Sequence, residues 1–376
     1  MNKIHMVDLI GQYQHIKPQV NEAFASVLDT AYYIGGPEVK GFASDLEKYL
    51  NVKHVIPCAN GTDALQIAMM GLGLKPGDEV ITVDFTFAAT VEVIALLNLT
   101  PVLVDVDEAT FNMDIDALKK AITPKTKAIV PVHLFGQCAN MEAVLAVAKA
   151  HNLFVIEDNA QAIGADYTFS DGRKMKSGTM GNVGTTSFFP SKNLGCFGDG
   201  GAIFTNDDEL AHTIRGIVNH GMYKRYYHDV VGVNSRLDSL QAAVLQIKLP
   251  LLDSYCAARL KAANYYNAAF ATCSKIETPV TSDFTTHVFH QYTLKINESV
   301  DRDALHQHLL DNGIPNAIYY PVSLHAQKAY KDARYNEADF KVTNQLCKTV
   351  LSLPMHTELD NEQQDFITKT IIDFCK

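Results

Sequence analysis

The sequence predicts an α/β protein with a large domain built on a mostly parallel sheet and a smaller α+β domain after it. Three observations lead to this prediction. Short apolar runs alternate with amphipathic helical patterns through the first part of the chain. Strands joined through helices pair in parallel and are covered on both faces. Near residue 250 this alternation ends, and a chain of 376 residues is long enough for a second core.

Six short apolar runs have the length and pattern of buried strands. They cover residues 80–83, 102–106, 128–133, 153–156, 185–189 and 202–205, with helical patterns such as 86–97 and 140–151 between them. The glycine-rich fingerprint GxGxxG does not follow the first strand. A Rossmann-type dehydrogenase is therefore disfavoured.

The second domain is marked by a long helical pattern that begins after residue 242 and runs to about residue 270. Pro250 lies inside this pattern and predicts a kink. The elements expected beyond it are residues 290–296, a helix from about 301, the strand-like run 318–324 and a helix over 360–375. We therefore divide the chain into a large domain of residues 13–250 and a small domain of residues 251–376. Residues 1–12 are expected to lie with the small domain or near the functional site.

Composition and charge exclude several classes of protein. The chain is 47% apolar and 20% charged, which is ordinary for a globular protein. Its net charge of -10 disfavours a broad nucleic-acid surface, because such a surface needs a basic face. No segment reaches the roughly 18 apolar residues of a membrane span, and the N-terminus lacks a signal-peptide core. We expect a cytoplasmic protein that binds neither nucleic acid nor membrane.

Cysteine and histidine usage points the same way. The seven cysteines are scattered and form no CxxC pair, which is typical of reduced thiols in a cytosol. The pairs His287 with His290 and His306 with His308 have no acidic or cysteine partner at a ligand spacing. No metal site is predicted.

The most informative segment is SFFPSKNLGCFGDGG, residues 187–201, which places Lys192 in a short polar turn between two apolar stretches. Glycines at 195, 198, 200 and 201 let the main chain approach a flat ligand. An amine held in this way by flanking backbone is typical of a lysine that forms a Schiff base. A surface lysine in a glycine-rich turn is the alternative, so the choice depends on what other segments supply.

The segment CANGTDAL, residues 58–65, follows a short β-like run and opens an apolar-periodic helix. The N–H groups of Gly61 and Thr62 and the Thr62 hydroxyl lie at the positive end of that helix and can hold a phosphate. The same residues also fit an ordinary helix start that is capped by Thr62 or Asn60.

The segment EDNAQAIGA, residues 157–165, comes directly after the buried-strand pattern LFVI. An acid at the carboxyl end of a parallel strand faces the crevice where such sheets bind ligands. Asp158 can therefore pair with a protonated pyridine nitrogen, with Ala160 against the ring face and Gln161 near its phenolic oxygen. An aspartate here is also a common helix cap. Together with Lys192 and the phosphate cradle, these residues indicate a site for pyridoxal 5'-phosphate (PLP).

A local basic island stands out in this acidic chain. Lys224 and Arg225 occur in HGMYKRYYHD, and Arg236 follows in GVNSRLDSLQAA, residues 232–243. Such a cluster suggests a place for a phosphate or a carboxylate. A solvated face beside a helix start explains Lys224 equally well.

The ordered set CANGTDAL, DFTFAAT, EDNAQAIGA, SFFPSK with GDGGA, and GVNSRLDSLQAA resembles the DegT-type sugar aminotransferases. These are PLP enzymes of the aspartate aminotransferase fold, fold type I. The resemblance runs from about Asp8 to the C-terminus. Within the family, the chain most resembles the 3-aminotransferases acting on UDP-2-acetamido-2-deoxy-3-keto-D-glucuronate. The runs that carry this closer match are PVHLFGQCA, SFFPSKNLGCFGDGGAIFTNDDELA and VGVNSRLD.

The resemblance implies a role for each matching residue. Lys192 becomes the Schiff-base lysine and proton shuttle, and Asp158 the partner of the pyridine nitrogen. The other cofactor contacts implied are Gly61, Thr62 and Ser187 on the phosphate, Ala160 and Gln161 beside the ring, Phe85 stacked on it, and Asn234 reaching the phosphate in the neighbouring subunit. The implied sugar contacts are Arg236 on a carboxylate, with Tyr320 and His325 of YYPVSLHAQ.

The family also implies a homodimer with shared active sites, and an amino transfer from glutamate to a keto sugar nucleotide. A sister branch that performs dehydration carries histidine at the position of Lys192, so the lysine argues for amino transfer. Two alternatives stay open. One is an aminotransferase acting at C3 or C4 of a dTDP- or UDP-linked deoxysugar, and the other is a PLP-binding sensor or scaffold without turnover.

Overall fold

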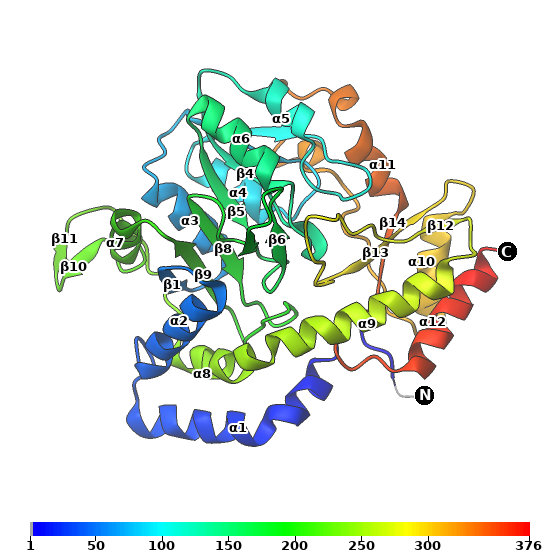
Figure 1. Cartoon of the computed structure of the whole chain (residues 1–376), viewed down its shortest axis with the longest axis horizontal. Coiled ribbons are helices and arrows are strands. Elements are labelled where there is room, and N and C mark those ends of the chain that lie inside the picture. Colours follow the sequence, from blue (N-terminus) through cyan, green and yellow to red (C-terminus); the bar gives the residue numbers. More distant parts are fainter. Residues whose placement is uncertain (1–2) are drawn as a thin grey trace.

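The computed structural model describes residues 3–376 and has a seven-stranded sheet at its centre (Figure 1). The strand order is β1-β9-β8-β5-β4-β2-β3. The strands are β1 (His54–Cys58), β2 (Glu79–Val83), β3 (Thr100–Val104), β4 (Thr126–Val130), β5 (Phe154–Asp158), β8 (Val183–Ser187) and β9 (Gly201–Thr205). Only β9 runs against the others. The predicted α/β class with a mostly parallel sheet is confirmed.

The predicted strands match the observed ones to within a few residues, and three of them, β3, β4 and β8, end earlier than expected. β4 ends at Val130 because Pro131 follows and has no N–H to donate to the ladder. β8 ends at Ser187, where it pairs with Gly201 of β9. The chain leaves the sheet there and enters the loop that carries Lys192.

Both faces of the sheet are covered by helices, as the parallel topology requires. On one face, Val80, Ala128 and Ile156 pack against α3 (Gly61–Gly71), α4 (Ala89–Leu96) and α7 (Asp208–Ile217). On the other, Ile81 and Val155 meet α5 (Ile115–Ala121) and α6 (Met141–His151). Neighbouring residues point to opposite faces because side chains alternate along a strand.

The β1–β9 edge is covered by α2 (Pro37–Leu50) and α8 (Ser239–Lys248). The long N-terminal helix α1 (Leu9–Thr30) packs on α8 through Ile16, Val20 and Val244 (Figure 1). Two short antiparallel pairs lie outside the main sheet: β6 (Asp166–Thr168) with β7 (Lys174–Lys176), and β10 (Met222–Lys224) with β11 (Tyr227–His228).

The predicted kink at Pro250 is present as a short 3-10 turn, Leu249–Leu251, between α8 and α9 (Leu252–Phe270). Beyond α9 lies a three-stranded antiparallel sheet of β12 (Ile276–Glu277), β13 (Tyr292–Ile296) and β14 (Val350–Leu353). The helices there are α10 (Arg302–Asp311), α11 (Lys341–Thr349) and α12 (Asn361–Phe374). Residues 318–324 form no strand, which corrects the strand-like interpretation of that run.

Apolar side chains from α9, β13, β14 and α12 form a separate core in this C-terminal part. Ile4 belongs to this core, and the Met355 N–H donates to the Met6 carbonyl at 3.2 Å. Residues 3–6 therefore lie with the C-terminal elements, whereas Met1 and Asn2 are outside the described residues. We propose a domain boundary near residue 250, at the 3-10 turn. None of the helices within residues 3–376 is both long and apolar enough to cross a membrane.

Candidate active site

The segments singled out in the sequence converge at one edge of the main sheet. Cys58 ends β1, Asp158 ends β5 and Ser187 ends β8, and these three strands run in the same direction. The carboxyl ends of parallel strands are where open α/β sheets bind their ligands. We therefore take this edge as the candidate active site.

Lys192 lies in a loop that closes on itself. The Cys196 N–H donates to the Phe188 carbonyl at 2.8 Å, and the Lys192 N–H donates to the Phe189 carbonyl at 2.8 Å. The residue as a whole is half-buried, but its amine lies deep in the protein. Burial lowers the pKa of Lys192 to about 8, although the negative charge of Asp158 acts in the opposite direction. Within residues 3–376 the amine has no hydrogen-bond partner, so it is free to react.

Asp158 is buried at the end of β5, and both of its carboxylate oxygens accept a hydrogen bond. The Thr90 hydroxyl donates to Oδ2 at 2.8 Å, and the Ala160 N–H donates to Oδ1 at 3.1 Å. The carboxylate is near enough to Lys192 to raise the pKa of that amine. Sequence reasoning missed Thr90, although it stands in the quoted run DFTFAAT.

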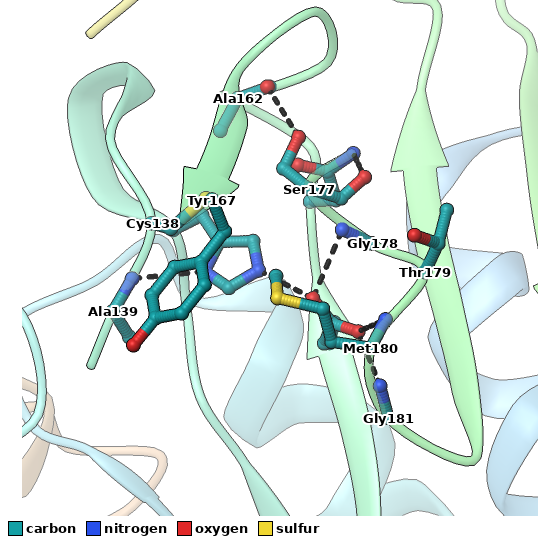
Figure 2. Close-up of polar contacts among 12 residues, drawn as sticks. Cys138, Ala139, Ala162, Tyr167, Ser177, Gly178, Thr179, Met180 and Gly181 are labelled. Atoms are coloured by element: carbon teal, nitrogen blue, oxygen red, sulfur yellow. Dashed lines mark hydrogen bonds and ion pairs between the residues drawn. The ribbon is translucent and has the colours of Figure 1, made fainter. Parts of the chain in front are cut away.

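The strand that carries Asp158 is anchored by its neighbour Glu157, whose side chain is fully buried. Its carboxylate accepts hydrogen bonds at 2.6 to 2.9 Å from the N–H groups of Gly178, Met180 and Gly181 (Figure 2). It also contacts His133 Nε2 at 2.8 Å. Because His133 Nδ1 accepts from Ala139 N–H at 3.1 Å, the ring proton belongs on Nε2. This network fixes the end of β5.

The start of α3 combines the two interpretations of CANGTDAL. Asn60 caps the helix, since its Oδ1 accepts from the Asp63 N–H at 2.8 Å. The N–H groups of Gly61 and Thr62 are left without an acceptor in the described part of the chain, and they can bind an anion. A methyl group on Gly61 would lie 2.7 Å from Ser187 Cβ, so only glycine lets the helix end approach Ser187. The residues present thus fit a phosphate group.

Gln161 lies between the sheet edge and Tyr320. Its Oε1 accepts from the Phe135 N–H at 2.8 Å, and its Nε2 donates to the Tyr320 hydroxyl at 3.3 Å. The side-chain amide is therefore held in one orientation, and one Nε2 hydrogen is left for a ligand. The structure thus brings Gln161 and Tyr320 together.

The prediction that Phe85 stacks on the cofactor ring is wrong. Its side chain is completely buried and meets Phe111, Phe135 and Tyr320 at ring-centroid distances of 6.1, 6.4 and 5.8 Å. A ring packed on these sides has no face to offer a ligand. Phe87 follows two residues later in the same run, just before α4, and is 59% exposed.

The prediction that His325 contacts the sugar also needs correction. The ring is buried and is stacked on Phe340. Its Nδ1 lies 2.6 Å from Asp84 Oδ2, and its Nε2 lies 3.3 Å from Glu337 Oε2. Both ring nitrogens already face carboxylates, so His325 ties its loop to Asp84, the residue after β2.

Asn234 and Arg236 are exposed on an extended segment, with Ser235 buried between them. The Ser235 hydroxyl accepts from the Ala59 N–H at 3.1 Å, which holds this segment beside the start of α3. Among the described residues neither Asn234 nor Arg236 has a side-chain partner. Lys224 and Arg225 lie on the β10–β11 hairpin, over the rings of Tyr227 and Tyr226.

One site residue that the sequence analysis missed is His290. It is buried near Lys192, and its Nδ1 has no partner among the described residues. Burial lowers the pKa of His290 well below its usual value, and the charges of Lys192 and Arg259 act in the same direction. The only sequence signal was the run HVFHQY, which the analysis considered solely as a metal motif.

Fold and site together define a PLP-dependent sugar-nucleotide aminotransferase. The chain belongs to the DegT/DnrJ/EryC1/StrS aminotransferase family, whose model matches residues 14–372. It is 46% identical to the UDP-2-acetamido-2-deoxy-3-oxo-D-glucuronate aminotransferase of Pseudomonas aeruginosa, over 95% of this chain and 96% of that one. It is 45% identical to a "pleiotropic regulatory protein" of Geobacillus stearothermophilus over 99% of each chain. A dTDP-3-amino-3,4,6-trideoxy-alpha-D-glucose transaminase of Streptomyces venezuelae is 39% identical over 96% and 93%.

Solved structures show the same relationship. A DegT DnrJ EryC1 StrS aminotransferase from Brucella abortus is 41% identical with a TM-score of 0.93, covering 99% of each chain. S. venezuelae DesV, solved in complex with a ketimine intermediate, is 38% identical with a TM-score of 0.95, covering 100% and 99%. NtdA from Bacillus subtilis, solved with bound cofactor PMP, is 31% identical with a TM-score of 0.87, covering 95% and 81%.

Proposed function

We propose that this aminotransferase transfers the amino group of glutamate to C3 of UDP-2-acetamido-2-deoxy-3-keto-D-glucuronate, for a cell-surface polysaccharide. The observation that carries the proposal is the 46% identity to the P. aeruginosa enzyme named for that substrate. The transaminase named for a dTDP-linked trideoxysugar stands at 39% and supports the alternative of a deoxysugar. The keto-uronate is therefore the favoured acceptor.

In the proposed site, the Lys192 amine and the Asp158 carboxylate would hold the aldehyde carbon and the ring nitrogen of PLP. Its phosphate is held by the N–H groups of Gly61 and Thr62 together with Ser187. Ala160 and Gln161 border the ring, and Phe87 replaces Phe85 as the stacking residue. Three observations of the structure support this fit. The amine of Lys192 has no partner among the described residues, the first two N–H groups of α3 have no acceptor there, and Gly61 lies close to Ser187.

PLP supplies an electron sink for the carbanion that amino transfer creates. Asp158 would promote this by accepting a hydrogen bond from the ring nitrogen, and its carboxylate is oriented by the Thr90 hydroxyl. Because the pKa of Lys192 is lowered to about 8, a useful fraction of its Nζ is neutral near neutral pH. This Nζ takes the proton from the α-carbon of glutamate and, in the second half of the reaction, delivers a proton to the sugar carbon.

The shared site in a homodimer is also part of the proposal. Large apolar side chains are exposed around the site: Phe189 in the Lys192 loop is 52% exposed and Val231, three residues before Asn234, is 86% exposed. A second copy of the chain would cover them. In this arrangement Asn234 reaches the phosphate in the partner's site, and Arg236 pairs with the sugar carboxylate. These roles explain why both side chains lack a partner within residues 3–376 of one subunit.

We place the enzyme in the cytoplasm, where its seven free cysteines would stay reduced. The G. stearothermophilus relative is named as a regulatory protein, which corresponds to the alternative of a PLP-binding sensor without turnover. A simple measurement tests this alternative. The purified protein is mixed with glutamate, and conversion of the bound cofactor to its amino form is followed by absorbance.

The substrate is tested with a panel of keto sugars. 3-Keto and 4-keto sugars linked to UDP or dTDP are each assayed with glutamate as donor. We expect the highest kcat/KM for the UDP-linked 3-keto-uronate. A higher value for a neutral deoxysugar would replace the proposed substrate and leave the aminotransferase assignment intact.

A further inference from the structure

A second buried lysine lies behind the Lys192 loop. Lys248, the last residue of α8, is 1% exposed, and its Nζ donates to the Gly195 carbonyl at 2.6 Å. No carboxylate within residues 3–376 pairs with it, although the ring of Phe197 lies 5.8 Å from Nζ. Burying an unpaired amine is costly, so a fold that retains one needs a reason for it.

A second residue on the same face of α8 also binds this part of the loop. Gln241 Oε1 accepts from the Phe197 N–H at 2.8 Å. Gln241 and Lys248 are seven residues apart, which is about two helical turns, so they project from one side of the helix. One side chain binds an N–H and the other binds a carbonyl, two residues apart on the loop backbone.

A shift at Gly195 would be transmitted directly to Lys192. A methyl group on Gly195 would collide with the carbonyl oxygens of Pro190 and Phe189, so the two limbs of the loop are in backbone contact. The loop is also closed where Cys196 bonds to the Phe188 carbonyl through its N–H at 2.8 Å and its Sγ at 3.0 Å. Fixing residues 195–197 therefore fixes the turn that holds Lys192.

We propose that Lys248 and Gln241 are positioning residues, which hold the Gly195–Phe197 backbone so that the Lys192 amine stands in the geometry needed to attach and retain PLP. Neither side chain touches the cofactor in this proposal. It rests on the proposed role of Lys192 as the covalent attachment point, which is tested separately below.

The test is to measure PLP binding to the apoenzyme of Lys248→Met, which keeps an unbranched side chain that is one atom shorter and removes the donor. Lys261→Met is the matched control, because Lys261 is exposed on α9 and has no partner in the described residues. We expect the dissociation constant of PLP to rise about tenfold or more in Lys248→Met, as the loss of a charge-assisted hydrogen bond implies, and to stay unchanged in the control. The midpoint of the pH titration of the visible cofactor absorbance should also move, which general loosening of the fold would not cause.

A second variant tests the other contact. Gln241→Leu removes the acceptor for the Phe197 N–H and should weaken PLP binding in the same direction, whereas Lys248→Arg, which retains a donor, should bind PLP more tightly than Lys248→Met. Wild-type PLP binding and an unshifted titration in Lys248→Met would overturn the proposal. If Lys248→Met does not fold, wild-type binding by Gln241→Leu overturns it instead.

Lys192→Ala separates this inference from the proposed function. If that variant still carries covalent PLP, the role of Lys192 is wrong and the positioning inference falls with it. If Lys192→Ala loses the covalent cofactor while Lys248→Met and Gln241→Leu bind PLP normally, only the positioning inference is wrong.

Discussion

The Thr90 hydroxyl donates to Oδ2 of Asp158 at 2.8 Å, and this bond joins the first turn of α4 to the end of β5. Asp158 already accepts the Ala160 N–H on its other oxygen, so a donor orients each of its two carboxylate oxygens. A carboxylate held in this way can accept the N–H of a pyridinium ring in a single orientation. In the proposed site, this residue pair would therefore set the direction of the cofactor ring.

The first prediction concerns Lys192. Replacing it with alanine should remove covalent attachment of PLP and leave the chain folded, because the loop is closed by backbone bonds of Phe188, Phe189 and Cys196. After borohydride reduction and unfolding, mass spectrometry should find no cofactor on the variant chain. Cofactor mass on the reduced variant would identify another lysine as the anchor, and Lys261→Ala serves as the control that keeps it.

The second prediction separates the acid from its orienting hydroxyl. Asp158→Asn should bind PLP but transfer amino groups orders of magnitude more slowly, since each pKa unit lost by the ring nitrogen is about 1.4 kcal/mol of preference for its protonated form. Thr90→Val keeps the shape and loses one hydrogen bond, so we expect a fall in kcat of about tenfold. Near-normal single-turnover rates in Asp158→Asn would remove Asp158 from this role.

The third prediction is a pH dependence of stability. Burial lowers the pKa of Lys248 from its ordinary value of 10.5 to about 8. Between these values the unfolded chain keeps the proton that the folded chain has lost, so the free energy of unfolding should rise with pH. One such lysine contributes about 1.4 kcal/mol per pH unit in this window.

Comparing the two apoproteins isolates that contribution. Urea unfolding at about pH 8 and about pH 10 should give a larger rise for the wild type than for Lys248→Met. Other titrating groups cancel in this difference because they are common to both chains. Equal rises in the two proteins would mean that Lys248 titrates normally in the folded state.

The fourth prediction bears on the sugar. A guanidinium at Arg236 can bind a C6 carboxylate with two parallel hydrogen bonds, which a neutral 6-deoxy sugar cannot use. Arg236→Ala should lower kcat/KM for the keto-uronate by about ten- to a hundredfold, with a much smaller effect on a neutral keto sugar. Equal losses on both substrates would mean that Arg236 only braces the start of α8.

The fifth prediction concerns the shared site. Lys192→Ala and Asn234→Ala are each expected to be inactive as pure proteins. Mixed and allowed to exchange subunits, they should regain some activity, because a hybrid dimer contains one intact site. Mass spectrometry of the intact dimers checks that exchange took place, and exchange without recovered activity would contradict the proposed position of Asn234.

The sequence was sufficient for the main sheet and the approximate position of the site, because apolar runs and strand ends are local signals. Asp158 could be found for that reason, as the acid that follows a buried strand. Phe85 and Phe87 could not be told apart, since both are aromatic and both follow the same strand. The packing that buries Phe85 comes from Phe111, Phe135 and Tyr320, which are distant in sequence.

The roles of His325 and Thr90 also could not be predicted from the sequence. His325 is paired with Asp84, which is 241 residues away, and Thr90 with Asp158, which is 68 residues away. Such contacts are created by the way α4 and the loop after α10 meet the sheet. The residues next to a histidine in the sequence do not indicate that its ring will pair with a buried carboxylate.

The helix α8 starts three residues after Arg236 and ends at Lys248. Ten helical residues span about 15 Å and bend little, so this helix is in effect a stiff rod. The segment before this helix is the one that we assign to the partner's cofactor and to the sugar. On the helix itself, Gln241 and Lys248 bind the loop of the subunit's own Lys192. In the proposed dimer, this one helix would therefore connect the two regions.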